Sequence, residues 1–289
     1  MTVPVIASVS ARYPEHEFIV VTEKRLGDMF YGMSNVRHIS THEPMPEADV
    51  LIDLQGGLST LRPRVLFRLR HKPVFRYHPS SELGEHERYA AVFRMAGLQS
   101  GDEFTTLPKC KEAESKITSL LQEGTHIRIG IAPFAKSRSN MLPYKVTKEI
   151  IAHYADMPHA QVFLFGAGTI ECEMLRQWSS IYPRTTSVAG TLTLGEELEL
   201  MRRLDVMICM DSANQHLSSL VGLRAVSVWC ATHPKNGFYG WKQNPQDCVQ
   251  VEDLRCRPCT LHGTKHCRFR NFACQQITAE QVLKIANKY

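Results

Sequence analysis

Short runs of apolar, β-branched residues alternate along the chain with longer segments in which apolar residues recur every three to four positions. The short runs predict buried strands, and the longer segments predict amphipathic helices. In the first part of the chain, strands are predicted at residues 18–22, 50–54 and 74–77, and helices near residues 4–12, 58–70 and 82–95. This alternation of strands and helices is typical of an α/β fold with parallel sheets.

A second series of the same kind follows a polar stretch at residues 99–124. Strands are predicted at residues 127–132, 162–165, 186–189, 206–209 and 225–229, and helices at residues 145–155, 170–180, 194–204 and 214–221. Two consecutive series predict two Rossmann-like domains that face each other across a cleft. We place the first domain at residues 1–104, a connection at 105–124 and the second domain at 125–289.

The first domain opens on a helix, whereas a doubly wound domain normally opens on a strand. Either the topology is unusual or a strand is missing. A parallel sheet that lacks one strand leaves backbone groups unpaired. We therefore expect the sheet of the first domain to be interrupted beside the strand at residues 18–22.

Composition narrows the class of protein. A chain of 289 residues with 43% hydrophobic and 22% charged residues is typical of globular domains. No apolar run approaches the roughly 20 residues of a membrane span. The N-terminal residues show neither a basic region nor a small-residue cleavage site, so we expect a cytoplasmic protein.

The positive charge is concentrated in one segment. Between Asp53 and Glu82 there is no acidic residue. The same segment contains the cationic residues Arg62, Arg64, Arg68, Arg70, Lys72 and Arg76. Such a run is either a solvated helix face or a surface for an anionic partner, such as a phosphorylated glycolipid headgroup. No nucleic-acid-binding motif accompanies it, so nucleic acid is not an expected partner.

The segment at residues 206–220 joins a buried strand directly to a helix. Asp211 and Ser212 lie at the junction, and both are good N-cap residues. The free N–H groups and the dipole of the helix start favour a phosphate group there. His216 lies in the first turns, where it can contact the same ligand. Taken alone, the segment favours a capped helix that carries a surface histidine.

The residues from Asp211 to Leu217, DSANQHL, resemble the D-[ST]-G-x-x-H-[LM] signature of the heptosyltransferase family, glycosyltransferase family 9. The resemblance extends in the family's order through the second domain, and more weakly to residues 48–56 of the first. It implies a GT-B fold of two Rossmann-like domains. It also implies donor-binding roles for Pro133, Ala135, Lys136, Arg138, Asn140, Gly166, Glu171, Leu192, Asp211, Ser212, Ala213 and His216.

In that family the helix start holds the donor's diphosphate, and a carboxylate at the position of Glu171 contacts the ribose. The loop around Leu192 lines the adenine pocket. Two departures from the family pattern change individual roles. Ala213 replaces the usual glycine, and Asn140 stands where a lysine is common, so Lys136 or Arg138 would supply the cation.

The resemblance implies a transferase that moves a sugar, heptose in particular, from an ADP-activated donor to a lipopolysaccharide-core or other anionic glycolipid acceptor. No cofactor is required, and contact with the cytoplasmic face of the inner membrane would be peripheral. We assign acceptor binding to Asp53, Arg62 and Arg64. The family's general base is an aspartate in a Gly-Asp turn. Residues 2–4 match the part that follows this turn, so the base would precede Met1 and we assign no catalytic residue.

Two alternatives stay open: a GT-B enzyme that uses another nucleotide sugar, including an epimerase-like activity, and a catalytically silent nucleotide-binding protein of the same fold. A separate question concerns four cysteines near the C-terminus, Cys256, Cys259, Cys267 and Cys274. Their spacing is compatible with a four-thiolate zinc site or with free thiols.

Overall fold

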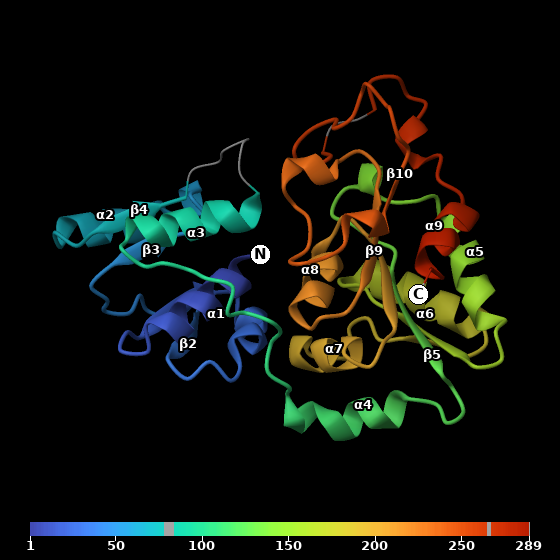
Figure 1. Cartoon of the computed structure of the whole chain (residues 1–289), viewed down its shortest axis with the longest axis horizontal. Coiled ribbons are helices and arrows are strands. Elements are labelled where there is room, and N and C mark those ends of the chain that lie inside the picture. The colour runs from blue at the N-terminus through green and yellow to red at the C-terminus, as the bar shows by residue number, and fades with distance from the viewer. Residues whose placement is uncertain (78–83, 265–266, 289) are drawn as a thin grey trace. The chain divides into compact units, whose positions relative to one another are not determined.

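The chain forms two compact units, Met1–Pro108 and Lys109–Tyr289, here called unit 1 and unit 2 (Figure 1). The computed structural model describes residues 1–77, 84–264 and 267–288. Every strand pair in these ranges is parallel. Together with the alternating helices, this confirms the predicted α/β fold.

Unit 1 contains the three strands that were predicted and one more. Its elements are α1 (Thr2–Arg12), β1 (Phe18–Thr22), β2 (Val36–Ser40), β3 (Leu51–Asp53), α2 (Leu61–Leu69), β4 (Val74–Arg76) and α3 (Glu85–Met95). The extra strand is β2, whose sequence VRHIS interrupts its apolar positions with Arg37 and His38. The helix predicted from residue 82 begins at Glu85, and residues 82 and 83 lie outside the described residues.

The strands of unit 1 form two separate pairs, β1–β2 and β3–β4. Within the described ranges, the second edge of β1 has no hydrogen-bonded neighbour. The predicted interruption beside residues 18–22 is therefore confirmed. α1 packs against α3 because both carry an apolar face. The buried residues of these faces include Val5, Val9, Val92 and Phe93.

Unit 2 is built on one six-stranded parallel sheet with the order β10-β9-β8-β5-β6-β7. Its strands are β5 (Ile127–Ala132), β6 (Ala160–Leu164), β7 (Thr185–Ser187), β8 (Val206–Met210), β9 (Ala225–Trp229) and β10 (Cys248–Gln250). Every residue of β6, β8 and β9 is buried, as expected for a parallel sheet with both faces covered.

Helices cover both faces of this sheet. α5 (Tyr144–Ala155), α6 (Thr169–Ile181) and α9 (Ala279–Ala286) lie on one face, and α7 (Leu194–Met201) and α8 (Ala213–Leu220) on the other (Figure 1). Short 3-10 helices lie at Lys24–Phe30, Leu58–Thr60, Lys111–Ala113, Arg138–Asn140, Pro234–Asn236, Pro245–Asp247 and Ala273–Gln275. The five predicted strands and four predicted helices of this unit are confirmed, with shifts of a few residues at their ends.

Most of the predicted connection at residues 105–124 belongs to unit 2. From Lys109 onward it forms part of this unit, and α4 (Glu114–Leu120) packs against α7. Lys116 Nζ lies 2.7 Å from a carboxylate oxygen of Glu196, and Arg203 Nη2 lies 2.9 Å from Glu114 Oε1. These contacts fix the segment on the surface of α7.

Candidate functional site

The carboxyl ends of β5 and β8 mark the point where the strand order of unit 2 reverses. From β5 the chain adds β6 and β7 on one side, and then β8, β9 and β10 on the other. Open α/β sheets bind ligands in the crevice at such a switch point. The loop after β5 starts at Pro133 and the loop after β8 starts at Asp211. Two of the predicted donor-site segments therefore begin at the ends of neighbouring strands.

α8 begins directly after β8, with its amino end at this edge of the sheet. Ser212 precedes it in an extended conformation, with φ −153° and ψ 176°, and its hydroxyl makes no capping hydrogen bond. The first turn contains no acidic residue. The free N–H groups at the start of the helix and its dipole therefore favour an anion such as a phosphate group.

Three side chains at this end of α8 hold buried polar atoms that find no partner in the described part of the chain. These atoms are Ser212 Oγ, both amide atoms of Gln215 and His216 Nδ1; Ser218 Oγ, in the last turn of α8, is a further atom of this kind. Gln215 and Ser218 are 0% exposed. A buried polar group without a partner costs about 1–3 kcal/mol. Such a cluster calls for a bound polar ligand or ordered water.

Asp211 joins the ends of β8 and β9. Its backbone N–H donates to the carbonyl oxygen of Val228 at 3.0 Å, and its Oδ2 accepts a hydrogen bond from Thr232 Oγ1 at 2.6 Å. Burial raises the pKa of the Asp211 carboxyl above its ordinary value. Because Thr232 engages one carboxylate oxygen, Asp211 holds the loop in front of α8 in place.

The loop after β5 contains two exposed cations with different surroundings. Lys136 is exposed and makes no hydrogen bond or ion pair within residues 1–77, 84–264 and 267–288. The Arg138 guanidinium lies over the ring of Tyr144, 3.9 Å from its centroid. Pro133 and Ala135 are buried and anchor the start of the loop. Of the two cations, Lys136 is the one available to an anionic ligand.

Asn140, predicted to contact the donor, is buried, and its Oδ1 has no partner among the described residues. It is 4% exposed, and its Nδ2 donates to the carbonyl oxygen of His262 at 3.5 Å. A Cβ atom on Gly263 would lie 2.3 Å from Asn140 Oδ1, so only glycine fits opposite this side chain. Ser137 Oγ also donates to the carbonyl oxygen of Gly263, at 2.7 Å. Asn140 therefore fastens the β5 loop to the segment around Gly263.

The loops after β6 and β7 continue the same edge of the sheet. After β6, Glu171 Oε2 accepts a hydrogen bond from the Ala167 N–H at 2.9 Å, which closes the turn that follows Gly166. After β7, Leu192 is half-buried just before the capping box in which Thr193 begins α7. Adjacent strands lie about 4.8 Å apart, so the three spacings from β8 to β7 span about 14 Å.

In unit 1, Asp53 organises the turn that follows β3. Its Oδ1 accepts hydrogen bonds from the backbone N–H groups of Gln55 at 3.1 Å and Gly56 at 2.9 Å. Its Oδ2 accepts one from Thr60 Oγ1 at 2.8 Å and lies 3.4 Å from Arg64 Nε. The Asp53 side chain is only 1% exposed. Asp53, predicted to bind the acceptor, therefore acts on the shape of the turn.

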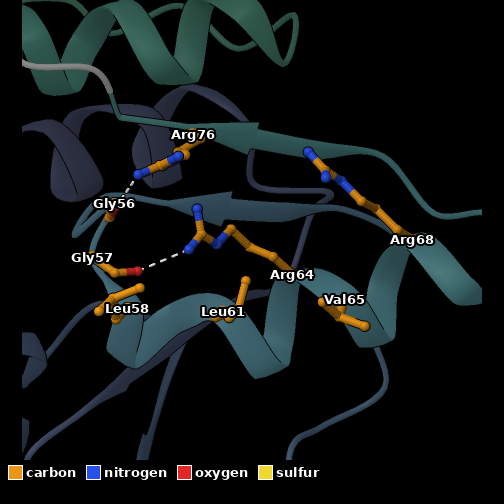
Figure 2. Close-up of a pocket in the computed structure, with 8 residues that line it drawn as sticks. All are labelled: Gly56, Gly57, Leu58, Leu61, Arg64, Val65, Arg68 and Arg76. Carbon is orange, nitrogen blue, oxygen red and sulfur yellow. Dashed lines mark hydrogen bonds between the residues drawn. The ribbon is translucent and has the colours of Figure 1, made fainter.

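A cavity of about 480 Å³ lies beside this turn (Figure 2). It is lined by Gly56, Gly57, Leu58, Leu61, Arg64, Val65, Arg68 and Arg76. Arg64 Nη2 donates to the Gly57 carbonyl oxygen at 2.8 Å, and Arg76 donates to that of Gly56. The Arg68 side chain has no hydrogen-bond or ion-pair partner among the described residues. Arg62, which we predicted at this site, is exposed and lies outside the lining.

Comparison with known proteins identifies the family of this chain. The model of glycosyltransferase family 9 (heptosyltransferase) matches residues 82–269, which is more than half of the chain. The chain belongs to glycosyltransferase family 9. This confirms the family that the DSANQHL motif indicated, and with it a glycosyltransferase. No curated protein matches the chain.

Solved structures support the same fold for this family 9 glycosyltransferase. The glycosyltransferase family 9 protein from Veillonella parvula DSM 2008 matches with a TM-score of 0.76 and 15% identity, covering 99% of this chain and 91% of that one. E. coli ADP-heptose LPS heptosyltransferase II matches with a TM-score of 0.64, 14% identity and coverages of 99% and 93%. E. coli heptosyltransferase WaaC, solved with ADP-2-deoxy-2-fluoro heptose, matches with a TM-score of 0.67 and 15% identity. The match covers 99% of this chain and 94% of that one.

The site of this family 9 glycosyltransferase contains residues that the sequence did not single out. Gln215 holds buried, unpartnered polar atoms, yet it lies within the motif without a fixed letter of its own. Arg68 and Arg76 line the unit 1 cavity. The sequence signal that could have identified Arg68 and Arg76 is the run of cationic residues without an acidic residue between Asp53 and Glu82.

Two further features concern metal ligands and membrane-spanning helices. Within the described ranges, no group of three or more His, Cys, Asp or Glu side chains could hold a metal ion. Cys256, Cys259, Cys267 and Cys274 are all free thiols, and Cys274 is buried. No helix in the described part of this family 9 glycosyltransferase is long and apolar enough to cross a membrane.

Proposed function

We propose that this glycosyltransferase transfers heptose from an ADP-activated donor to a lipopolysaccharide-core acceptor. The donor's diphosphate binds at the amino end of α8, at the switch point of unit 2. The observation that carries this proposal is the group of unpartnered buried polar atoms on Ser212, Gln215 and His216. Diphosphate oxygens and sugar hydroxyl groups are the partners that such atoms lack.

The dimensions of the edge support a nucleotide. The span of about 14 Å from the end of β8 to the end of β7 is comparable to the length of an extended nucleoside diphosphate. The diphosphate would lie at Ser212, the ribose near Glu171, and the base near Leu192. Two of the structural relatives are described with ADP-heptose or an analogue of it, which makes ADP-heptose the first donor to test.

The chemistry requires that negative charge on the departing diphosphate be stabilised. The N–H groups at the start of α8 already point to this position, so they need little rearrangement when the charge develops. Lys136 adds a full positive charge at the end of the neighbouring strand. These groups need neither a metal ion nor another cofactor. We assign no residue as the general base for the acceptor hydroxyl.

We place the anionic groups of the acceptor in the unit 1 cavity. Three arginines line it, and a guanidinium group binds phosphate and carboxylate groups through paired hydrogen bonds. A lipid-linked acceptor would bring the enzyme to the cytoplasmic face of the inner membrane.

Calorimetric titration of the full chain with ADP, GDP and UDP tests the donor assignment. We expect ADP to bind at least tenfold more tightly than the other two. ADP-heptose and a heptose-deficient lipopolysaccharide core should then yield ADP and a glycosylated acceptor, detected by chromatography. Preference for UDP or GDP would identify another nucleotide sugar. ADP binding without transfer from ADP-heptose would favour a silent binding protein.

Replacing Lys136 by Met should weaken ADP binding about tenfold or more, because a charge-assisted hydrogen bond to a diphosphate is worth about 1.5–3 kcal/mol. The dependence of the affinity on salt concentration should also become shallower. Arg138→Met is the matched control. Arg138 stacks on Tyr144, so its loss should have a smaller effect on ADP binding. Equal effects of the two substitutions would contradict the role given to Lys136.

The affinity for ADP-heptose should not rise as the pH falls from 8 to 5.5. Burial lowers the pKa of His216 to about 3, so its imidazole stays neutral across this range. It can therefore act on the donor only as a neutral hydrogen-bonding group. The diphosphate of ADP-heptose carries no group that titrates near neutral pH. Calorimetry across the range should give the same profile for the His216→Gln variant. An affinity that grows below about pH 6.5 and loses this dependence in the variant would show a charged imidazole.

A further inference from the structure

Lys116 of α4 connects this helix to the loop that follows β7. Its ammonium group donates a hydrogen bond to the carbonyl oxygen of Thr191 at 3.3 Å and another to Glu196 Oε2 at 2.7 Å. Thr191 belongs to the loop, and Glu196 lies in the first turn of α7. One side chain therefore joins three segments, which are α4, the loop and the start of α7.

Glu196 also binds the loop directly. Its Oε2 accepts a hydrogen bond from the Thr193 N–H at 2.8 Å, and its own N–H donates to Thr193 Oγ1 at 3.3 Å, which forms the capping box of α7. Burial raises the pKa of the Glu196 carboxyl, but the hydrogen bonds from Lys116 and from the Thr193 N–H outweigh this effect and bring the pKa below its ordinary value. The carboxylate is therefore charged near neutral pH and holds Lys116 beside the loop.

The loop between β7 and α7 has few other constraints. Thr191 donates to the carbonyl oxygen of Val188 through its N–H at 3.1 Å and through its Oγ1 at 2.9 Å, which closes a turn. Gly190, inside this turn, has a φ of 72°, and both Gly190 and Thr191 are exposed. Apart from Lys116, no segment outside the loop makes a hydrogen bond to residues 189–192 in the described part of the chain.

α4 is itself tied to the sheet of unit 2. It lies along α7 (Figure 1), and Ile117 in the middle of α4 is 1% exposed. Gln161, a buried residue of β6, donates through Nε2 to the carbonyl oxygen of Leu120 at 2.7 Å and accepts through Oε1 from the N–H of Gln122 at 3.0 Å. Lys116 therefore extends from a helix whose position is fixed by contacts with the core.

We propose that Lys116 is a positioning residue for the nucleotide base, because it holds the loop at residues 189–193 in the conformation that receives the adenine ring. The inference rests on the proposed function, which places the base near Leu192 at the end of β7, three strand spacings from the diphosphate. Lys116 acts through the loop, and no contact between its ammonium group and the nucleotide is required. A loop that is already ordered loses less conformational entropy when the base binds.

Arg203 provides a matched control at the other end of α7. Its Nη2 lies 2.9 Å from Glu114 Oε1, so it also joins α4 to the segment of α7 through one exposed ion pair. Its side chain makes no hydrogen bond to residues 189–193 within the described ranges. Loss of either cation removes one positive charge and one contact of α4. Only the loss of Lys116 releases the loop.

The test compares the full chain with its Lys116→Met and Arg203→Met variants by calorimetric titration with ADP, GDP and inorganic pyrophosphate. Pyrophosphate carries the diphosphate without ribose or base. Lys116→Met should weaken ADP binding about three- to tenfold, reduce the preference for ADP over GDP, and leave pyrophosphate binding unchanged. Arg203→Met should bind all three ligands like the parent. Both variants should melt close to the parent, because an exposed ion pair contributes little to stability.

Hydrogen exchange without nucleotide measures the order of the loop directly. The hydrogen-bonded N–H groups of Thr191 and Thr193 should exchange faster in Lys116→Met than in the parent. In Arg203→Met they should exchange at the parent's rate. Unchanged exchange in Lys116→Met would contradict the proposal, because the loop would then be ordered without the ammonium group.

Three binding results would overturn the proposal. The first is parental ADP binding by Lys116→Met, and the second is an equal loss in the two variants. The third is a loss of pyrophosphate binding as large as the loss of ADP binding, which would show an effect of charge on the diphosphate. In each of these cases the parent still binds ADP, so the proposed donor site stands.

A failure of the proposed function gives a different result. If the parent prefers GDP or UDP, the preferred nucleotide takes the place of ADP in the same comparison, and Lys116 is tested against that base. A parent chain that binds no nucleotide would refute the donor site and the role of Lys116 together.

Discussion

Replacing Ala213 by Glu should weaken ADP binding about a hundredfold while leaving α8 as stable as before, or slightly more stable. Ala213 is the first residue of α8 and is exposed. A carboxylate there interacts favourably with the helix dipole, by about 0.3–1 kcal/mol. The same carboxylate would repel a diphosphate at the helix end and compete for its N–H donors. Stability and affinity should therefore change in opposite directions.

Ala213→Gln is the matched control, since it adds a side chain of the same size without charge. Any steric obstruction should appear in both variants, whereas the electrostatic loss should appear only with Glu. Calorimetric titration with ADP gives the affinities, and thermal unfolding without nucleotide gives the stabilities. If Glu and Gln weakened ADP binding equally, the diphosphate would not lie at the amino end of α8.

The strongly patterned elements of the fold could be predicted from the sequence. β6, β8 and β9 are apolar except for Gln161 and Ser227 because both faces of their sheet are covered, and such runs are visible in the letters alone. β2 could not be predicted in this way, because its exposed Arg37 breaks the apolar run and its pairing with β1 is set by contacts distant in sequence. Its existence depends on the partner strand more than on its own composition.

Two elements near the end of unit 2 could not be predicted for a different reason. α9 and β10 were not predicted, although Thr278 and Gln281 form a capping box that the sequence already displays. What holds these elements in place is long-range. Arg224 donates to both carboxylate oxygens of Asp247, at 3.1 and 2.7 Å, and to the carbonyl oxygens of Ile285 and Ala286. No local pattern connects residues so far apart.

The location of the candidate site could be predicted from the sequence, but the roles of its individual residues could not. The motif located the end of β8 and the start of α8, because a strand followed at once by N-cap residues and a helix is a local signal. Whether a side chain has a free polar atom depends on its neighbours in space. Asn140 and Gln215 show this, because Asn140 has a partner for its Nδ2 and none for its Oδ1, while both amide atoms of Gln215 are buried without a partner.

The polar groups of the two units serve different purposes. At the start of α8, the buried amide atoms of Gln215 lack partners, which costs stability. At the turn after β3, the Asp53 carboxylate has three hydrogen bonds and an adjacent guanidinium. This saturation makes the turn a rigid support for the cavity beside it. Substitutions at Asp53 should therefore act first on the stability of unit 1.

Asp53→Leu should destabilise unit 1 by about 3–5 kcal/mol, because it leaves the buried Arg64 charge without its counter-ion. It also removes the acceptor of the Gln55 and Gly56 N–H groups. Arg64→Met should cost less, about 1–3 kcal/mol, since three hydrogen bonds to the Asp53 carboxylate remain. The double variant should be less destabilised than the sum of the two, because no unpaired charge is left behind.

The chain offers a probe that separates its two units. All three tryptophans, Trp178, Trp229 and Trp241, belong to unit 2. In urea titrations, tryptophan fluorescence therefore follows unit 2, while far-ultraviolet circular dichroism follows both units. Asp53→Leu should lower the midpoint of the ellipticity change and leave the fluorescence midpoint and the ADP affinity in place. Equal losses for Asp53→Leu and Arg64→Met that simply add in the double variant would show that the two side chains are not coupled. The turn beside the cavity would then be held by its backbone alone.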